Sequence, residues 1–260
     1  MLNLQKALLL VSETVRKAGS YLIQHLGRIK EVEFKGERNL VTDVDKSCEQ
    51  IIKSLLVENF SEIPILGEEL GGENAELCWV IDPLDGTNNY FHSYPVFCIS
   101  IALLEKGSPI LGVIYDPNRE EMFTAIKGKG AYMNGEKIQV SQTNSLKQAL
   151  LATGFYYEFK KQRDTNIGHF VDFLYEVQGI RRSGSAAIDL AYVACGRLDG
   201  FWELGLQPWD TSAGFLIVEE AGGKVTKFDG SLFDPFFPQI VASNSRIHSE
   251  MLEILGRRKF

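Results

Sequence analysis

Apolar residues near the N-terminus recur every three or four positions, which is the spacing of one face of an α-helix. They predict a long amphipathic helix that ends near Gly27. The polar stretch 28–39 that follows is typical of an exposed loop. Thr42 or Asp43 can cap a second helix, because both residue types accept backbone N–H groups. The apolar positions of the two helices are Leu4, Ala7, Leu8, Val11, Val15, Ala18, Leu22 and Leu26, then Cys48, Ile51, Ile52, Leu55 and Leu56.

Short apolar runs after the second helix predict strands. The pair Asn134-Gly135 between Met133 and Glu136 indicates a tight hairpin. Beyond Leu146 the pattern changes, and helices mix with strands without strict alternation. This favours an α+β or layered α/β fold over a barrel. The predicted strands are 64–66, 78–81, 97–104, 110–115, 149–153, 201–203, 223–228 and 239–242, and the later helices are 166–177, 186–195, 211–221 and 246–255.

Composition and charge narrow the class of protein. With 45% hydrophobic and 23% charged residues, the 260-residue chain is globular rather than disordered. No apolar run approaches the ~20 residues of a membrane span, and we expect no signal peptide. The four cysteines lie far apart without a C-x-x-C pair, so reduced thiols in a cytoplasmic protein are expected. The net charge of −7 disfavours direct binding to nucleic acid, although bound cations can reverse the local sign.

The most informative segment is 79–88, where an apolar strand is expected to end in Asp82. Pro83 fixes a turn, and Asp85 follows three residues after Asp82. Two carboxylates with the Leu84 carbonyl between them form an all-oxygen donor set, which suits Mg²⁺. Gly86 allows backbone to approach a ligand closely, and a helix that begins just after it could bind phosphate with its free N–H groups. The alternative is an ordinary turn with an aspartate cap.

Three further acidic residues strengthen the metal interpretation. Glu68 follows another short strand, Asp210 lies beside Trp209 at the start of a helix, and Asp45 lies early in the second helix. Each has an ordinary alternative. Glu68 alone would be a solvated loop acid, Asp210 an N-cap, and Asp45 a first-turn acid that complements the helix dipole.

Together these pieces resemble the inositol monophosphatase family of Mg²⁺-dependent, Li⁺-sensitive phosphatases. The two signatures are Ile81-Asp82-Pro83-Leu84-Asp85-Gly86-Thr87 and Trp209-Asp210-x-x-Ala213-Gly214, and further matches are Gly67-Glu68-Glu69, Leu40-Val41-Thr42 with Asp45, and Gly184-Ser185-Ala186-Ala187. The resemblance implies a five-layer αβαβα sandwich, of the type shared with fructose 1,6-bisphosphatases. It also implies a homodimer and two or three Mg²⁺ ions per subunit.

The resemblance also assigns metal ligands. Glu68, Asp82 and the Leu84 carbonyl would bind the first Mg²⁺. Asp82, Asp85 and Asp210 would bind the second, so that Asp82 bridges the two ions. A third, weaker ion would lie near Glu68. Residues 1–146 would thus supply most ligands, and residues 147–260 would supply Asp210 and the substrate wall within one compact catalytic unit.

The same resemblance assigns catalytic and binding roles. Thr87, hydrogen-bonded to Asp45, would orient or help deprotonate the attacking water, with Glu68 beside it. The N–H groups of Gly86 and Thr87 would bind phosphate. The residues implied for the alcohol half of the substrate are Asp85, Ser185, Ala186, Glu203 and Asp210.

Simple electrostatics agrees with this chemistry. A phosphate monoester dianion repels hydroxide, and nearby carboxylates would add to that repulsion unless divalent cations reversed the field. Phosphoryl transfer then needs positioning and charge stabilisation rather than a protein nucleophile. The absence of a C-x5-R loop is consistent with that, and the four scattered histidines are expected to be structural or surface residues.

The substrate is less sharply indicated. Glu203 can accept hydrogen bonds from vicinal hydroxyls and would repel a second phosphate, which favours inositol 1-phosphate. Arg182, next to Arg181, could instead bind a second phosphate, so fructose 1,6-bisphosphatase or dual activity is the alternative. A salt bridge at the surface or between subunits is the favoured role for these arginines. Histidinol phosphate, NADP and adenosine bisphosphate are further family substrates. Lys35 roughly matches the family's mobile-loop lysine, with a spacing to Asp45 that differs by a residue.

Two other classes of function remain open at this point. One is a regulatory, protein-binding role in transcription, which some bacterial relatives of the family have. The other is a plain module for divalent cations. The presence of all the expected acids and of the Thr87–Asp45 pair favours the enzyme.

Overall fold

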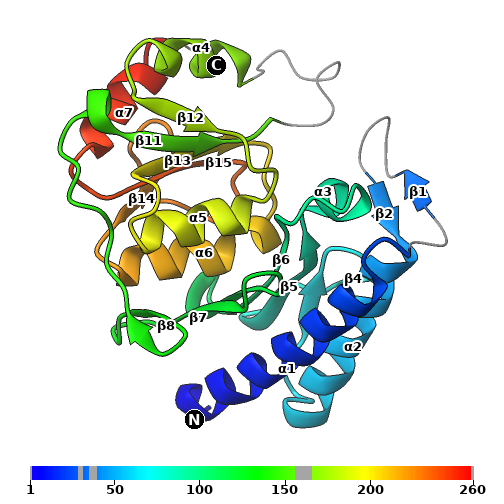
Figure 1. The fold of residues 1–260 in the computed structure, drawn as a ribbon. Coiled ribbons are helices and arrows are strands. Elements are labelled where there is room, and N and C mark those ends of the chain that lie inside the picture. The colour runs from blue at the N-terminus through cyan, green and yellow to red at the C-terminus, as the bar shows by residue number, and fades with distance from the viewer. Residues whose placement is uncertain (1, 29–31, 35–39, 156–165, 259–260) are drawn as a thin grey trace.

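The computed structural model describes residues 2–28, 32–34, 40–155 and 166–258, which form five alternating layers of helices and sheets (Figure 1). Helices α5 and α6 lie between an eight-stranded and a five-stranded sheet. Helices α1 and α2 cover the outer face of the larger sheet, and α4 and α7 cover that of the smaller one. The expected αβαβα sandwich is confirmed. The helices are α1 (Leu4–His25), α2 (Asp43–Asn59), α3 (Thr87–Phe91), α4 (Ile167–Leu174), α5 (Ala186–Ala194), α6 (Pro208–Glu220) and α7 (His248–Leu255), with a short 3₁₀ helix, η1 (Leu146–Gln148).

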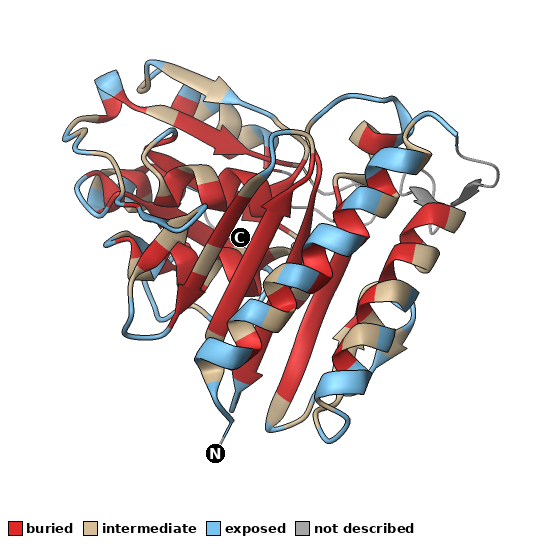
Figure 2. Ribbon diagram, turned by 60° about the horizontal axis from the view of Figure 1, so that its bottom comes forward, coloured by how far each residue is buried: buried red, intermediate tan, exposed pale blue. Residues whose placement is uncertain are grey.

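Helices α1 and α2 form as the apolar spacing predicts. Their buried positions face the large sheet and their polar positions face outward, so buried and exposed segments alternate along both helices (Figure 2). Thr42 caps α2, since its Oγ1 accepts the Val44 N–H at 3.2 Å. The expected loop 28–39 was wrong in part, because strand β1 (Val32–Phe34) pairs antiparallel with β2 (Leu40–Thr42). Lys35 lies outside the described residues.

The large sheet has the order β10-β9-β8-β7-β6-β5-β3-β4 and contains all four strands predicted before residue 116. The Asn134-Gly135 hairpin is also confirmed, with φ of +51° and +86° at its two central residues. The strand at 121–126 was not predicted. The strands are β3 (Ile65–Gly67), β4 (Gly71–Gly72), β5 (Leu77–Asp85), β6 (Cys98–Glu105), β7 (Ser108–Asp116), β8 (Glu121–Ile126), β9 (Ala131–Met133) and β10 (Glu136–Lys137).

Strand β5 differs from the prediction at its functional end. It continues through Asp85 rather than ending at Asp82, and its register with β6 shifts between these two residues. Pro83 lies inside the shift and has no N–H to offer the ladder, so an irregularity is the form in which a sheet tolerates it. The shift places both aspartates at the edge of the buried core.

The small sheet has the order β12-β11-β13-β15-β14. Its strands β11, β13, β14 and β15 match the predicted ones, whereas β12 was not predicted. Helix α6 begins at Pro208, three residues before the predicted start, because proline suits the first helical position and Gln207 serves as the N-cap. Asp210 is therefore at the third helical position, and the ordinary alternative that made it the N-cap does not hold. The strands are β11 (Leu150–Thr153), β12 (Gly179–Arg181), β13 (Gly200–Leu204), β14 (Lys224–Thr226) and β15 (Gln239–Ser243).

The core explains why β5 is apolar on both faces. Trp79 and Ile81 pack under α1 and α2, whereas Cys78 and Val80 pack against the α5 and α6 side. A strand covered on both faces has no solvated face to make its sequence alternate. Among the described residues, no helix is both long enough and apolar enough to cross a bilayer.

Candidate active site

A cavity of about 350 Å³ opens where the two sheets and the central helices meet. Its volume suits a small molecule. All but one of the site residues predicted from the sequence line it. These lining residues are Glu68, Asp82, Leu84, Asp85, Gly86, Thr87, Arg182, Ser185, Ala186, Glu203 and Asp210. The remaining one, Asp45, contacts Thr87 from behind the cavity wall.

Parallel pairing brings Glu68 next to Asp82. Strand β3 runs parallel to β5, with Gly67 opposite Ile81. The Glu68 N–H donates to the Ile81 carbonyl at 3.2 Å, one residue before Asp82. Two segments that are distant in sequence therefore deliver their acids to the same point of the sheet.

Asp82 is the most deeply buried acid of this group. Its side chain is 1% exposed, and the Leu84 N–H donates to its Oδ1 at 2.9 Å. Burial raises the pKa of Asp82 well above its usual range, and the charges of Glu68, Asp85 and Asp210 raise it further. An acid whose charge is opposed in this way is stabilised in its ionised form by a nearby cation.

Asp85 is held by the start of α5. Ser185 Oγ and the Ala187 N–H both donate to Asp85 Oδ2 at 2.7 Å. The Cys98 thiol lies 3.8 Å from the same oxygen. Burial raises the pKa of Asp85, although these hydrogen bonds act in the opposite direction. The bonds fix the carboxylate at the cavity wall.

The start of α6 brings in Asp210. Asp210 Oδ2 accepts the Gln207 N–H at 2.7 Å, which completes a capping box. Ser100 pairs opposite Asp82 in the sheet, and its Oγ donates to the Trp209 carbonyl at 3.1 Å. This bond ties the first turn of α6 to the strand beside Asp82.

A glycine and a threonine form the corner of the cavity. Gly86 has φ of +99°, and a Cβ there would lie 2.9 Å from the Val96 carbonyl oxygen, so only glycine fits. Thr87 Oγ1 lies 2.9 Å from Asp45 Oδ1 and 3.1 Å from the Leu84 carbonyl. Thr42 donates both its N–H and its hydroxyl to Asp45 Oδ2. Burial nevertheless raises the pKa of Asp45.

The opposite wall carries acids from the C-terminal half. Glu203 is 9% exposed, and burial raises its pKa well above the usual range, followed by the charge of Asp189. Asp189 was not predicted from the sequence. It is buried on α5, lines the cavity and accepts the Ser183 hydroxyl at 2.7 Å. Burial raises the pKa of Asp189 to about 8. Its position four residues after Ser185 was the one available signal.

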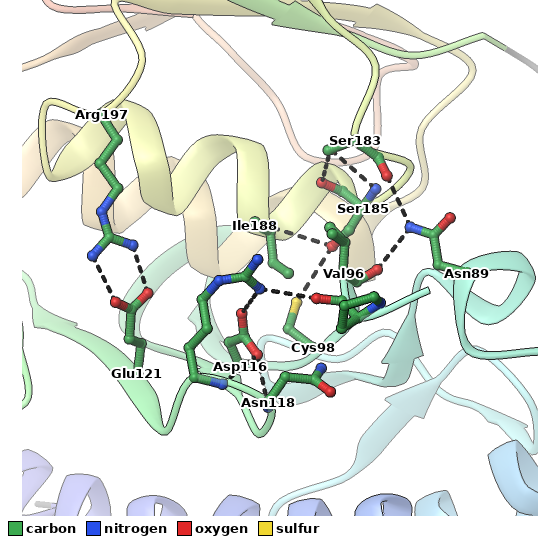
Figure 3. A network of polar contacts seen from close by, with 12 residues as sticks. Asn89, Val96, Cys98, Asp116, Asn118, Glu121, Ser183, Ser185, Ile188 and Arg197 are labelled. Atoms are coloured by element: carbon green, nitrogen blue, oxygen red, sulfur yellow. Dashed lines mark hydrogen bonds and ion pairs between the residues drawn. The ribbon is translucent and has the colours of Figure 1, made fainter. Parts of the chain in front are cut away.

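The segment before α5 is tied to the corner of the cavity. Figure 3 shows Asn89 donating to the Val96 and Ser183 carbonyls, at 2.7 and 2.8 Å. Ser185, drawn beside Cys98, accepts the Ile188 N–H as the N-cap of α5. These bonds join α3, β6 and α5, which carry or flank Thr87 and Asp85.

The donor chemistry of the cavity suits a hard cation. Its acids offer only oxygen, no histidine or cysteine lines it, and Arg182 is its single cationic residue among the described lining. In the described part of the chain, no three His, Cys, Asp or Glu side chains already form a cluster that could hold a metal ion. Like charges repel, and a bound cation would offset the mutual repulsion of these carboxylates.

Comparison with known proteins places the chain in context. A model of the inositol monophosphatase family matches residues 3–258. An inositol-1-monophosphatase from Synechocystis is 46% identical over 258 residues, which cover 98% of this chain and 90% of that protein. The Nus factor SuhB of Escherichia coli K12 is 43% identical over 242 residues, which cover 91% of each.

Solved structures show the same relationship. An inositol monophosphatase from Anabaena is 42% identical, with a TM-score of 0.91 over 99% of this chain and 98% of its own. An IMPase/NADP phosphatase complexed with Mg²⁺ and phosphate is 28% identical, with a TM-score of 0.86 over 98% of this chain and 97% of its own.

Proposed function

Because the chain belongs to the inositol monophosphatase family, we propose that this phosphatase hydrolyses the phosphate monoester of a small polyol in a Mg²⁺-dependent reaction. Inositol 1-phosphate, cleaved to inositol and phosphate, is the substrate we favour. The observation that carries the proposal is the meeting of Glu68, Asp82, Asp85 and Asp210 at one cavity, beside the Thr87–Asp45 pair. The cytoplasmic location and the homodimer stay predictions.

The acids of the cavity would bind two Mg²⁺ ions, and a third more weakly near Glu68. Glu68, Asp82 and the Leu84 carbonyl would form one site, and Asp82 would share the other with Asp85 and Asp210. When bound, Mg²⁺ lowers the pKa of water and offsets the charge of the phosphate ester. The solved relative that contains Mg²⁺ and phosphate supports this assignment. Li⁺ sensitivity stays a prediction of family membership.

The chain's own residues would orient the water and the phosphate. The Thr87 hydroxyl directs its proton toward Asp45, so its oxygen lone pairs can accept a hydrogen bond from water. Thr42 keeps Asp45 in place for that task. The N–H groups of Gly86 and Thr87 would bind the phosphate oxygens at the corner of the cavity.

The far side of the cavity supports a polyol over a bisphosphate. Glu203 and Asp189 are buried acids that can form hydrogen bonds with hydroxyl groups, and in its ionised form either would repel a second phosphate. Burial raises the pKa of both acids, and the nearby charge of Arg182 opposes that shift. Hydrolysis of fructose 1,6-bisphosphate, alone or beside inositol phosphate, remains the alternative because Arg182 lines the same cavity.

Phosphate release across a panel of esters tests the proposal. The panel contains inositol 1-phosphate, fructose 1,6-bisphosphate, histidinol phosphate, NADP and 3′-phosphoadenosine 5′-phosphate, each with and without Mg²⁺. We expect Mg²⁺-dependent release with the highest kcat/KM for inositol 1-phosphate. Preference for the bisphosphate sugar would overturn the substrate, and release without divalent cations would overturn the chemistry.

A role in transcription is the second candidate, because the relatives at 43% identity include proteins named Nus factor SuhB. Such a role would depend on a protein surface and not on the acids of the cavity. An Asp85→Asn variant separates the two functions. If this variant lost both the transcriptional role and phosphate release, the cavity would serve both functions.

A further inference from the structure

Glu49 lies on the opposite side of the Glu68 turn from the cavity. It belongs to α2, its side chain is fully buried, and its carboxylate faces the backbone of residues 67–70. Oε2 accepts the Glu69 N–H at 2.7 Å, and Oε1 accepts the Leu70 N–H at 3.1 Å. Glu49 does not line the cavity, so it is not placed to be a ligand itself.

Lys53 completes this arrangement one helical turn later. Its Nζ lies 3.2 Å from Glu49 Oε1 and donates to the Gly71 carbonyl at 3.1 Å. A buried carboxylate is costly unless it is paired and hydrogen-bonded, and here it has both kinds of partner. An apolar side chain could fill the same space but could not accept two N–H groups from the turn.

Gly67 provides the room for the Glu49 carboxylate. A Cβ at Gly67 would lie 2.0 Å from Oε1 and 2.6 Å from Cδ of Glu49. The φ of Gly67 is not positive, so its backbone conformation is open to other residues. Glycine is therefore needed at this position to leave space for the Glu49 carboxylate, and not to allow the backbone conformation of the turn.

Glu68 lies between these two fixed points. Its own N–H is bound to the Ile81 carbonyl of β5, and the next two N–H groups are bound to Glu49. We propose that Glu49 is a positioning residue that sets the Glu68 backbone, and through it the Glu68 carboxylate, for cation binding. The inference rests on the proposed function, since it assumes that Glu68 binds Mg²⁺.

Substitutions at both ends of the Glu49–Gly67 contact test this role. Partners that orient a metal ligand typically contribute 10–100-fold to metal affinity. We expect Glu49→Gln and Glu49→Ala to weaken Mg²⁺ binding by about tenfold, measured by calorimetry without substrate. Saturating Mg²⁺ should restore most of kcat. Glu58→Gln, an exposed charge change on the same helix, is the matched control and should leave Mg²⁺ affinity unchanged.

The double variant gives the sharper readout. Gly67→Ala alone should displace the carboxylate and weaken Mg²⁺ binding as Glu49→Ala does. In the Glu49→Ala background the clash is gone, so adding Gly67→Ala should cost no further affinity. Circular dichroism and thermal melting would test whether each variant is folded, and the isosteric Glu49→Gln serves if Glu49→Ala does not fold.

The outcomes separate this inference from the proposed function. Unchanged Mg²⁺ affinity in folded Glu49 variants, with only a lower Tm, would show that Glu49 supports the fold alone. Additive losses in the double variant would also overturn the proposal. A wild-type chain that neither binds Mg²⁺ nor releases phosphate would overturn the proposed function and this inference with it.

Discussion

The two sides of the cavity hold their polar groups by different means. The strand-end wall consists of Glu68, Asp82, Asp85 and Thr87, and each is fixed by a hydrogen bond. Glu68 bonds to the Ile81 carbonyl, Asp82 to the Leu84 N–H, Asp85 to the start of α5, and Thr87 to Asp45. The far wall consists of Arg182, Asp189 and Glu203. Asp189 accepts one hydroxyl, from Ser183, and Glu203 is buried on β13. A Cβ at Gly154 would lie 2.2 Å from Glu203 Oε1, so space rather than a backbone bond sets that carboxylate.

This difference suggests a division of labour. Groups that act on the phosphate must be placed accurately, because small displacements cost much of the rate. Groups that select the alcohol half can be positioned by packing, since each contributes a single contact to binding. We therefore expect substitutions on the strand-end wall to abolish turnover and those on the far wall to change substrate preference.

The largest effect is expected for Asp85→Asn. The amide keeps the shape of the side chain but has no negative charge. It would therefore weaken both the proposed cation binding and the hydrogen bond from Ser185. We predict a loss of about 10³-fold in kcat, comparable to the removal of a principal electrostatic group. Steady-state phosphate release measures it, and Asp229→Asn, an exposed acid outside the cavity, is the control. Near-normal turnover would remove Asp85 from the chemistry.

Thr87→Val should have the next largest effect. Valine keeps the shape but has no hydroxyl to bridge Asp45 and the water. We predict a fall in kcat of about 10²-fold, in the range for a group that assists proton transfer. Thr87→Ser should recover most of the rate, because it restores the oxygen. Equal losses in both variants would point to packing rather than to the hydroxyl.

A smaller and selective effect is expected for Glu203→Ala on the far wall. Loss of its contacts with hydroxyl groups should lower kcat/KM for inositol 1-phosphate by about tenfold, the size of one hydrogen bond to a charged group. Hydrolysis of an aryl phosphate, which has no such hydroxyls, should change little. Equal losses on both esters would remove the distinction between the walls.

The two walls also differ in how far the sequence predicts them. Asp82, Asp85, Gly86 and Thr87 lie within six residues, so a local pattern contains most of their chemistry. Asp189 was missed because its place at the cavity depends on how α5 packs against β13. A helix position gives no such information by itself, since a buried and an exposed aspartate look alike in a helical sequence.

The secondary structure, too, could be predicted only in part from local sequence patterns. Long periodic helices and apolar strands were predicted because burial acts on every third or second residue. The start of α6 and the extension of β5 depended instead on Pro208 and Pro83, which change backbone bonding without changing the apolar pattern. Strand β12 forms by pairing with β11, a partner that lies more than 25 residues earlier in the chain.

His248 is a buried residue that belongs to neither wall of the cavity, so it serves as a reference for both. It is 1% exposed, and its ring lies 2.9 Å from Thr226 Oγ1 and 2.8 Å from Ser243 Oγ. Thr226 donates its own proton to the Lys227 carbonyl, so it must accept from Nε2–H, and the ring is neutral with Nδ1 as an acceptor. Burial, and then the charge of Lys224, lowers the pKa of His248 from 6.5 to about 4.

Because its pKa is lowered, His248 takes up a proton at a lower pH in the folded state than in the unfolded state. The contribution of His248 is therefore fully present above pH 6.5 and is lost as the pH falls toward 4. Between pH 7 and 5 we expect the free energy of unfolding to fall by about 2 kcal/mol from this residue. In urea titrations His248→Gln should lack that fall, and its phosphate release at pH 7 should match the wild type. An equal loss in the variant would place the acid sensitivity elsewhere, and a loss of turnover would show that the small sheet is coupled to the cavity more tightly than the two walls suggest.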